Sequence, residues 1–279
     1  MSETIRITLL VENTVYQPGL QAEHGLAWHV KLGDKQVLFD TGQSDLVRAN
    51  AAQLGLDLGR LDAVGLSHGH YDHCGGLPGV RTAAPECSIF AHPAATAAKF
   101  SMDAQGKTRA MGMPDAAREL VQSGRNVIAT IDPTEVVPGL FVTGEIPRQT
   151  DFEDVGGRFY LDAAGRQPDP LCDDQALYFP SRDGLVVVLG CAHAGVVNTL
   201  HYIQKLTGEK RVHAVLGGMH LLNATPERRQ KTIAALEACG VAQLLPVHCT
   251  GWPATPELWR HFQDRCLRGS VGTRLDFIR

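Results

Sequence analysis

The sequence predicts an α/β protein in which two β-sheets pack together and helices cover their outer faces. The early part of the chain contains β-branched, apolar segments joined by short turns, which indicate hairpins. The later part alternates such segments with amphipathic helical patterns, which is typical of strands joined by helical crossovers. Many of the predicted strands also end in a polar side chain, so we expect these side chains to meet along one edge of the sheets.

Length and composition limit the function classes. The chain has 279 residues, which we interpret as one domain over 1–279, and its formal net charge of −4 argues against binding to nucleic acid or to an anionic membrane. No apolar run approaches the roughly 20 residues that span a bilayer. The seven cysteines are scattered and form no CxxC pair, which favours reduced thiols. Because the first residues also lack signal-peptide features, we expect a cytoplasmic protein.

The first half of the chain is predicted to be mainly β-structure. Strands are expected over residues 5–11, 26–32, 35–39, 61–67 and 88–91, and a helix over 46–54 that stops at Gly55. Residues 94–124 are rich in Ala, Met, Gln and charge, and we interpret them as a helical insertion. A second hairpin is expected over 135–142, followed by a long surface loop over 148–173.

The second half predicts alternating strands and helices. A hairpin over 176–189 precedes a helix over 196–206, a strand over 212–216, a helix over 226–239 and a strand over 244–247. Thr225 followed by Pro226 is a typical start for the second of these helices.

A dense group of potential metal ligands follows the apolar segment 61–66. His68, His70, Asp72 and His73 fall within six positions, and neutral imidazole with carboxylate suits zinc, iron and manganese. A structural zinc ion is the alternative, but such sites are closed by four Cys or His ligands. Further histidines follow the later strands, so the ligands exceed that need, and we expect one or two divalent metal ions, most simply zinc, with manganese or iron as alternatives.

The segment His68-Gly69-His70-Tyr71-Asp72-His73 resembles the HxHxDH signature of the metallo-β-lactamase superfamily. Asp40-Thr41-Gly42 resembles an earlier motif of that superfamily. The resemblance implies a four-layer αββα sandwich with metals at one edge of the two sheets. It also implies that His68 and His70 hold one metal, that Asp72, His73 and His248 hold a second, and that Asp40 supports the site from behind the ligands.

Two positions depart from the common superfamily pattern. Where a third histidine for the first metal is usual, the segment 142–147 offers Glu145. Where an aspartate usually bridges the metals, Gly190 is followed by Cys191, with His193 two residues later. We expect His193 to be a metal ligand. Cys191 and Glu145 are weaker candidate ligands, and Glu145 is otherwise expected to support the site from behind the ligands.

These departures, with the motifs after several strands, resemble one branch of the superfamily. The motifs are Asp174-Gln175-Ala176-Leu177, the run from Gly190 to Thr199, Gly217-Gly218-Met219-His220 and His248-Cys249-Thr250-Gly251. They are similar to 7,8-dihydropterin-6-yl-methyl-4-(β-D-ribofuranosyl)aminobenzene 5′-phosphate synthases. The resemblance implies a metal-dependent condensation of an aminobenzene ribosyl phosphate with a dihydropterin methyl diphosphate, which releases pyrophosphate. The expected partner is then a small molecule, such as a pterin or a phosphorylated compound.

Other polar residues are assigned with a structural alternative for each. Asp72 and His220 are the candidate catalytic residues, and a packed, hydrogen-bonded histidine is an equal alternative for His220. Arg148 is a candidate phosphate ligand or a solvated loop residue, and Asn13 a candidate substrate ligand or a structural residue. For His24 and Cys249 we favour structural roles. Trp252 and Tyr71 suit a flat ring, although packing is the commoner role of aromatic residues.

Three functions therefore remain open at the level of sequence. The first is the synthase-like enzyme. The second is a hydrolase that uses metal hydroxide on a phosphoester, lactone or thioester. The third is a non-enzymatic, metal-dependent sensor or binding module.

Overall fold

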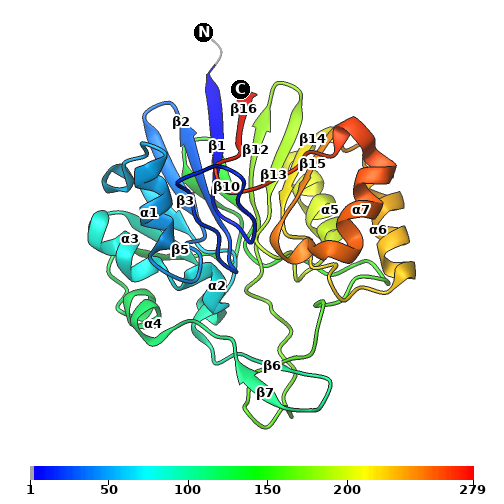
Figure 1. The fold of residues 1–279 in the computed structure, drawn as a ribbon, viewed down its shortest axis with the longest axis horizontal. Helices are drawn as coiled ribbons and strands as arrows, with labels where there is room; N and C mark the ends of the chain where they lie inside the picture. Colours follow the sequence, from blue (N-terminus) through cyan, green and yellow to red (C-terminus); the bar gives the residue numbers. More distant parts are fainter. Residues whose placement is uncertain (1–2) are drawn as a thin grey trace.

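The computed structural model describes residues 3–279 and contains two large β-sheets packed face to face (Figure 1). In spatial order, the first sheet consists of β16 (Arg274–Ile278), β1 (Thr4–Val11), β2 (Ala27–Leu32), β3 (Lys35–Phe39), β4 (Ala63–Gly65), β5 (Ser88–Ala91) and β8 (Val127–Ala129). The second consists of β15 (Gln243–Pro246), β14 (Val212–Gly217), β13 (Gly184–Val188), β12 (Leu177–Ser181), β10 (Leu140–Val142) and β9 (Thr134–Val137).

Helices cover the outer face of each sheet. The first sheet is covered by α1 (Leu46–Gln53), α3 (Leu77–Ala83) and α4 (Asp115–Gln122), and the second by α5 (Val196–Thr207), α6 (Pro226–Ala238) and α7 (Gly251–Phe262) (Figure 1). The remaining short helices are α2 (Tyr71–Cys74), η1 (Leu58–Arg60), η2 (Pro93–Thr96), η3 (His248–Thr250) and η4 (Gln263–Arg265). This arrangement confirms the predicted four-layer αββα sandwich.

Strand β13 shows why the central strands read as continuous apolar runs. Val186 and Val188 pack in the core between the sheets, whereas Leu185 and Val187 pack against the outer helices. A strand covered on both faces gains by burying every side chain, so it loses the polar alternation of a solvated strand. The register Val186↔Ala214 pairs β13 in parallel with β14.

The interpretation of residues 94–124 as a helical insertion is wrong for most of that segment. Besides η2, only α4 is helical, and β6 (Phe100–Met102) pairs with β7 (Thr108–Ala110) as a hairpin. Asp103 Oδ1 accepts hydrogen bonds from Gln105 N at 2.9 Å and Lys107 N at 2.8 Å, which stabilises the turn. The long loop adds β11 (Phe159–Tyr160) to β6, which makes a small third sheet at one end of the sandwich (Figure 1).

The topology brings several strand ends to one edge. Strands β3 and β4 run parallel, as do β13, β14 and β15, so the carboxyl ends within each set lie together. The start of β1 and the end of β16 lie at the opposite end of the sandwich from α2 (Figure 1). Among residues 3–279, no helix is both long and apolar enough to cross a bilayer.

Candidate metal centre

The loop from β4 to α2 presents His68 and His70 to this edge, and the first turn of α2 adds His73. His70 is the last extended residue before α2, and Gly69 passes so close to η2 that an added Cβ would lie 1.9 Å from the Ala95 carbonyl oxygen. Only glycine fits there. Asp173 Oδ2 accepts a hydrogen bond from Gly69 N at 2.8 Å, so a buried carboxylate also fixes the loop.

The histidines of the first lobe of the site are His68, His70 and His193. One potential ligand atom from each lies within 4.8 Å of the other two. The distance from His68 Nε2 to His70 Nδ1 is 2.9 Å. His70 Nε2 and His193 Nε2 are buried and have no hydrogen-bond partner within residues 3–279. The structure thus places His193 beside the HxH pair, as the sequence led us to expect.

The second lobe contains His24, Asp72 and His248, whose ligand atoms also lie within 4.8 Å of one another. Asp72 Oδ2 lies 3.1 Å from His24 Nε2 and 3.5 Å from His248 Nε2. His73 Nε2 is 3.2 Å from His248 Nε2, so His73 joins this lobe. His24, for which the sequence favoured a structural role, is therefore a candidate ligand.

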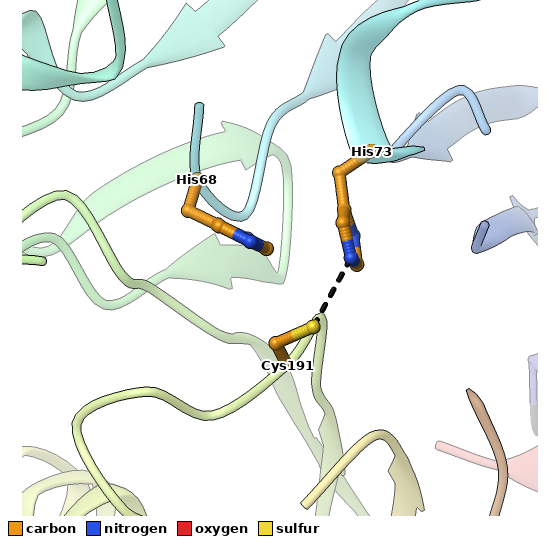
Figure 2. Close-up of side chains that lie close together, drawn as sticks. All are labelled: His68, His73 and Cys191. Carbon is orange, nitrogen blue, oxygen red and sulfur yellow. Dashed lines mark hydrogen bonds between the residues drawn. The ribbon is translucent and has the colours of Figure 1, made fainter. Parts of the chain in front are cut away.

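Cys191 lies where the two lobes meet. Its Sγ atom is 3.1 Å from His73 Nε2 (Figure 2). It forms one potential metal-binding group with His68 and His73, and a second with His248 and Cys249. The cysteine thus occupies the place at which the resemblance implies a bridging ligand. Cys249, which the sequence led us to interpret as a buried thiol, belongs to the same surroundings.

Four of the histidines are oriented in the same way. Each Nδ1 faces an oxygen atom and leaves Nε2 directed into the site. The pairs are His68 with Ser67 Oγ at 2.9 Å, His73 with Asp40 Oδ2 at 2.7 Å, His193 with Val155 O at 2.8 Å and His248 with Asn13 Oδ1 at 3.0 Å. Such partners fix the imidazole tautomer that leaves a lone pair on Nε2 for a metal.

Asp40 anchors the first of these orienting networks. It is completely buried. Its Oδ1 accepts a hydrogen bond from Ser67 N and its Oδ2 accepts one from Ser67 Oγ, each at 2.7 Å. Its backbone φ is 61°, and Ala192, His220 and His248 at other strand ends also have positive φ. Left-handed backbone at non-glycine residues costs roughly 1–3 kcal/mol each, and it is characteristic of functional sites.

The protonation states suit metal binding. Burial lowers the pKa of His70 to about 4, and burial together with neighbouring histidines lowers the pKa of His68 and His193 well below the ordinary value. His73 differs, because Asp40 and Asp72 overcome the effect of burial and raise its pKa to about 9. Neutral imidazoles, a carboxylate and a thiol, several with unpartnered buried atoms, fit one or two divalent cations. Binding would displace the proton from His73.

Two predicted residues have other surroundings than we expected, and a third takes its structural alternative. Glu145 is exposed and belongs to none of the potential metal-binding groups, so it does not support the site. The Arg148 guanidinium donates to the carbonyl oxygens of His193 at 3.0 Å and Leu171 at 3.1 Å, which engages it with the backbone rather than with a phosphate. Asn13 Oδ1 orients His248, which is the structural alternative that the sequence offered for this residue.

His220 lies against the first lobe. Its ring centroid is 4.2 Å from that of His193, edge to face, and neither ring nitrogen has a partner within the described part of the chain. Burial and His70 lower its pKa to about 3. The packed, hydrogen-bonded alternative is thereby excluded for the described residues, and a neutral imidazole faces the site.

The fold and this cluster define a metal-dependent enzyme, and the chain belongs to the metallo-β-lactamase superfamily, whose model matches residues 21–170. Over 99% of its length, with 97% of the relative covered, it is 29% identical to the 7,8-dihydropterin-6-methyl-4-(β-D-ribofuranosyl)-aminobenzene-5′-phosphate synthase of Methanocaldococcus jannaschii. An uncharacterized protein of that organism is 27% identical, with 90% of this chain and 93% of the relative covered.

A solved structure agrees with these relatives. Tm1679, a metal-dependent hydrolase of the β-lactamase superfamily, superposes with a TM-score of 0.82 at 31% identity, with 97% of this chain and 98% of that chain covered. Zn²⁺-bound PqqB from Methylobacterium extorquens shares the fold at 15% identity, with a TM-score of 0.61 over 97% and 99% of the two chains. An enzyme is thus favoured over a non-enzymatic sensor.

Proposed function

We propose that this protein is a synthase that joins an aminobenzene ribosyl phosphate to a dihydropterin methyl diphosphate and releases pyrophosphate. The observation that carries the proposal is the position of Cys191 between the two lobes, in a chain similar over almost its whole length to the M. jannaschii synthase. A thiolate is a softer ligand than the carboxylate usual at this place, and it favours zinc over magnesium or calcium.

The two lobes define which residues would hold metal. His68, His70 and His193 would hold one ion, Asp72, His73 and His248 a second, and Cys191 would lie between them. Bound ions would supply Lewis acidity and neutralise charge on a departing diphosphate. Both ions are proposed to be zinc, with iron or manganese as alternatives.

The chain's own residues would bind and orient the reactants. With a pKa of about 3, His220 is a poor proton acceptor at neutral pH. We therefore assign it a hydrogen-bonding role toward a substrate oxygen rather than the role of a general base. The second candidate catalytic residue, Asp72, is ionised because His73 and its other histidine neighbours overcome burial and hold its pKa well below the usual range, which suits a ligand.

The experiment is to mix zinc-loaded protein with the two proposed substrates and to measure pyrophosphate release. We expect pyrophosphate release that requires the aminobenzene substrate. Cys191→Asp should lower the rate of release at least tenfold. Cys87→Ser, which changes a buried thiol outside the site, should leave that rate unchanged. Hydrolysis of the diphosphate at the same rate without the aminobenzene substrate would contradict the proposal.

A hydrolase is the second candidate, because Tm1679 carries that description at 31% identity. Rapid turnover of a phosphodiester, lactone or thioester, lost in His70→Ala, without any condensation, would establish it instead.

A further inference from the structure

A cavity of about 350 Å³ adjoins the second lobe of the metal centre. His248 forms part of its wall, and the cavity extends from there between the loop after β1, the loop after β14 and helix α7. Asn13 Oδ1 holds His248 Nδ1, and Glu12 Oε1 accepts a hydrogen bond from His248 N at 2.8 Å. The inner wall is thus fixed by the contacts that orient a candidate metal ligand.

Exposed apolar side chains are concentrated around this cavity. Six large hydrophobic residues are exposed within residues 3–279, and three of them line it: Tyr16 at 80%, Leu222 at 48% and Trp252 at 76%. The other three, Ile128, Ile131 and Leu206, do not. Exposed aromatic rings around a cavity that reaches a reactive centre are typical of a site that binds an apolar, planar ligand.

The lining of the cavity includes one guanidinium, that of Arg268, and one carboxylate, that of the buried Glu12. Within residues 3–279, Arg268 has no carboxylate partner within ion-pair distance, and its guanidinium lies 5.0 Å from the centroid of the Trp259 ring. The nearby carboxylate of Glu12 is committed to His248 N and to Thr14 Oγ1, the latter at 3.0 Å. A guanidinium held over an aromatic ring is well suited to a phosphate.

We infer that this cavity binds an aromatic phosphate monoester, with its ring against Trp252 and Tyr16 and its phosphate on Arg268. The inference rests on the proposed function, because it assigns the cavity to the aminobenzene ribosyl phosphate. This assignment leaves the first lobe of the metal centre and His220 for the second substrate.

The test uses zinc-loaded protein and 4-aminophenyl phosphate as the probe, with binding measured by calorimetry. We expect Trp252→Ala to weaken the affinity about tenfold, Trp252→Phe to restore most of it, and Arg268→Gln to weaken it about tenfold. Aniline, which lacks the phosphate, should respond to Trp252→Ala but not to Arg268→Gln.

Two substitutions serve as matched controls. Arg260→Gln removes an exposed arginine of α7 that does not line the cavity, and Leu206→Ala truncates an exposed apolar side chain outside the cavity. Both controls should bind the probe as the unchanged protein does. Unchanged affinity for the probe in both Trp252→Ala and Arg268→Gln would overturn the inference. Binding of the probe that requires zinc but neither of these two side chains would overturn it as well.

The outcome separates this inference from the proposed function. Normal pyrophosphate release in Trp252→Ala and Arg268→Gln, with unaltered binding of the probe, would refute the cavity and leave the synthase in place. Affinity that depends on both side chains, without any pyrophosphate release, would support the cavity and refute the synthase.

Discussion

Replacing Asp40 by Asn tests whether the buried carboxylate sets the tautomer of a metal ligand. Asp40 is completely buried and accepts three hydrogen bonds of 2.7 Å, two from Ser67 and one from His73 Nδ1. Asparagine has nearly the same shape and tolerates the φ of 61° at this position, so the backbone should be retained. The substitution therefore changes mainly the charge and one acceptor.

The expected magnitude follows from these contacts. If the amide oxygen keeps the bond from Ser67 N, the amide NH₂ faces His73 Nδ1, which must then become an acceptor. The proton of His73 moves to Nε2, the atom 3.1 Å from Cys191 Sγ and 3.2 Å from His248 Nε2, where a metal needs the lone pair. Loss of such an orienting partner typically costs 10–100-fold in metal affinity, about 1.4–2.7 kcal/mol.

The assay is competition for zinc between the protein and a chromophoric chelator, with Asp62→Asn as the control. Asp62 also accepts two hydrogen bonds, from Lys35 Nζ and Gln36 N at 2.9 Å each, but lies outside the site. Its variant should keep the affinity of the unchanged protein. The reasoning is refuted if Asp40→Asn binds zinc as tightly as Asp62→Asn does.

Two further predictions concern stability and can be checked by urea unfolding of the metal-free protein. Lys99 is buried between Asp169 at 3.0 Å and Asp173 at 2.8 Å, so Lys99→Met should lower the free energy of unfolding by about 3–5 kcal/mol. Lys35→Met, at a solvent-exposed pair, should lower it far less, and equal losses would contradict this. Burial raises the pKa of Asp174 to about 7, so its contribution is full below about pH 4 and is lost as the pH rises through 7. The free energy of unfolding of Asp174→Asn, relative to that of the unchanged protein, should therefore increase by about 3 kcal/mol from pH 5 to pH 8. A difference between the two proteins that does not change with pH would disprove this.

Most of the fold follows from local patterns in the sequence. The hairpin of β2 and β3, with Leu32 paired to Lys35, lies within a residue of its predicted bounds, because alternation and a glycine turn specify it locally. The segment around β6 and β7 was mispredicted because its composition favours helix, and the second neighbour of β6, formed by Phe159 and Tyr160 of β11, comes more than 50 residues after β6. Contacts of that range leave no signal in a local window.

The candidate site was predicted less completely than the fold. The HxHxDH segment carries its own signal, because four potential ligands, three histidines and one aspartate, fall within six positions. His24 does not, since it lies alone before Gly25 and reaches Asp72 only when β2 places the two loops side by side. Its flanking motif, Glu23-His24-Gly25, was the available signal. Glu23 accepts hydrogen bonds from Gln43 N and Ser44 N, so that motif also orders the loop after Asp40.

The contrast between Glu145 and His193 shows what determines membership in the site. Both follow strands of the second sheet, but Gly144, with φ of 64°, turns the chain against the carbonyl of Ile131 and leaves Glu145 in solvent. The loop after β13 instead turns inward, where Arg148 and Val155 O fix the backbone and the ring of His193. His193 would thus supply, from the end of β13, the nitrogen that Glu145 does not offer at the end of β10, because a metal ligand is defined by its position in space. Sequence order alone does not specify that position.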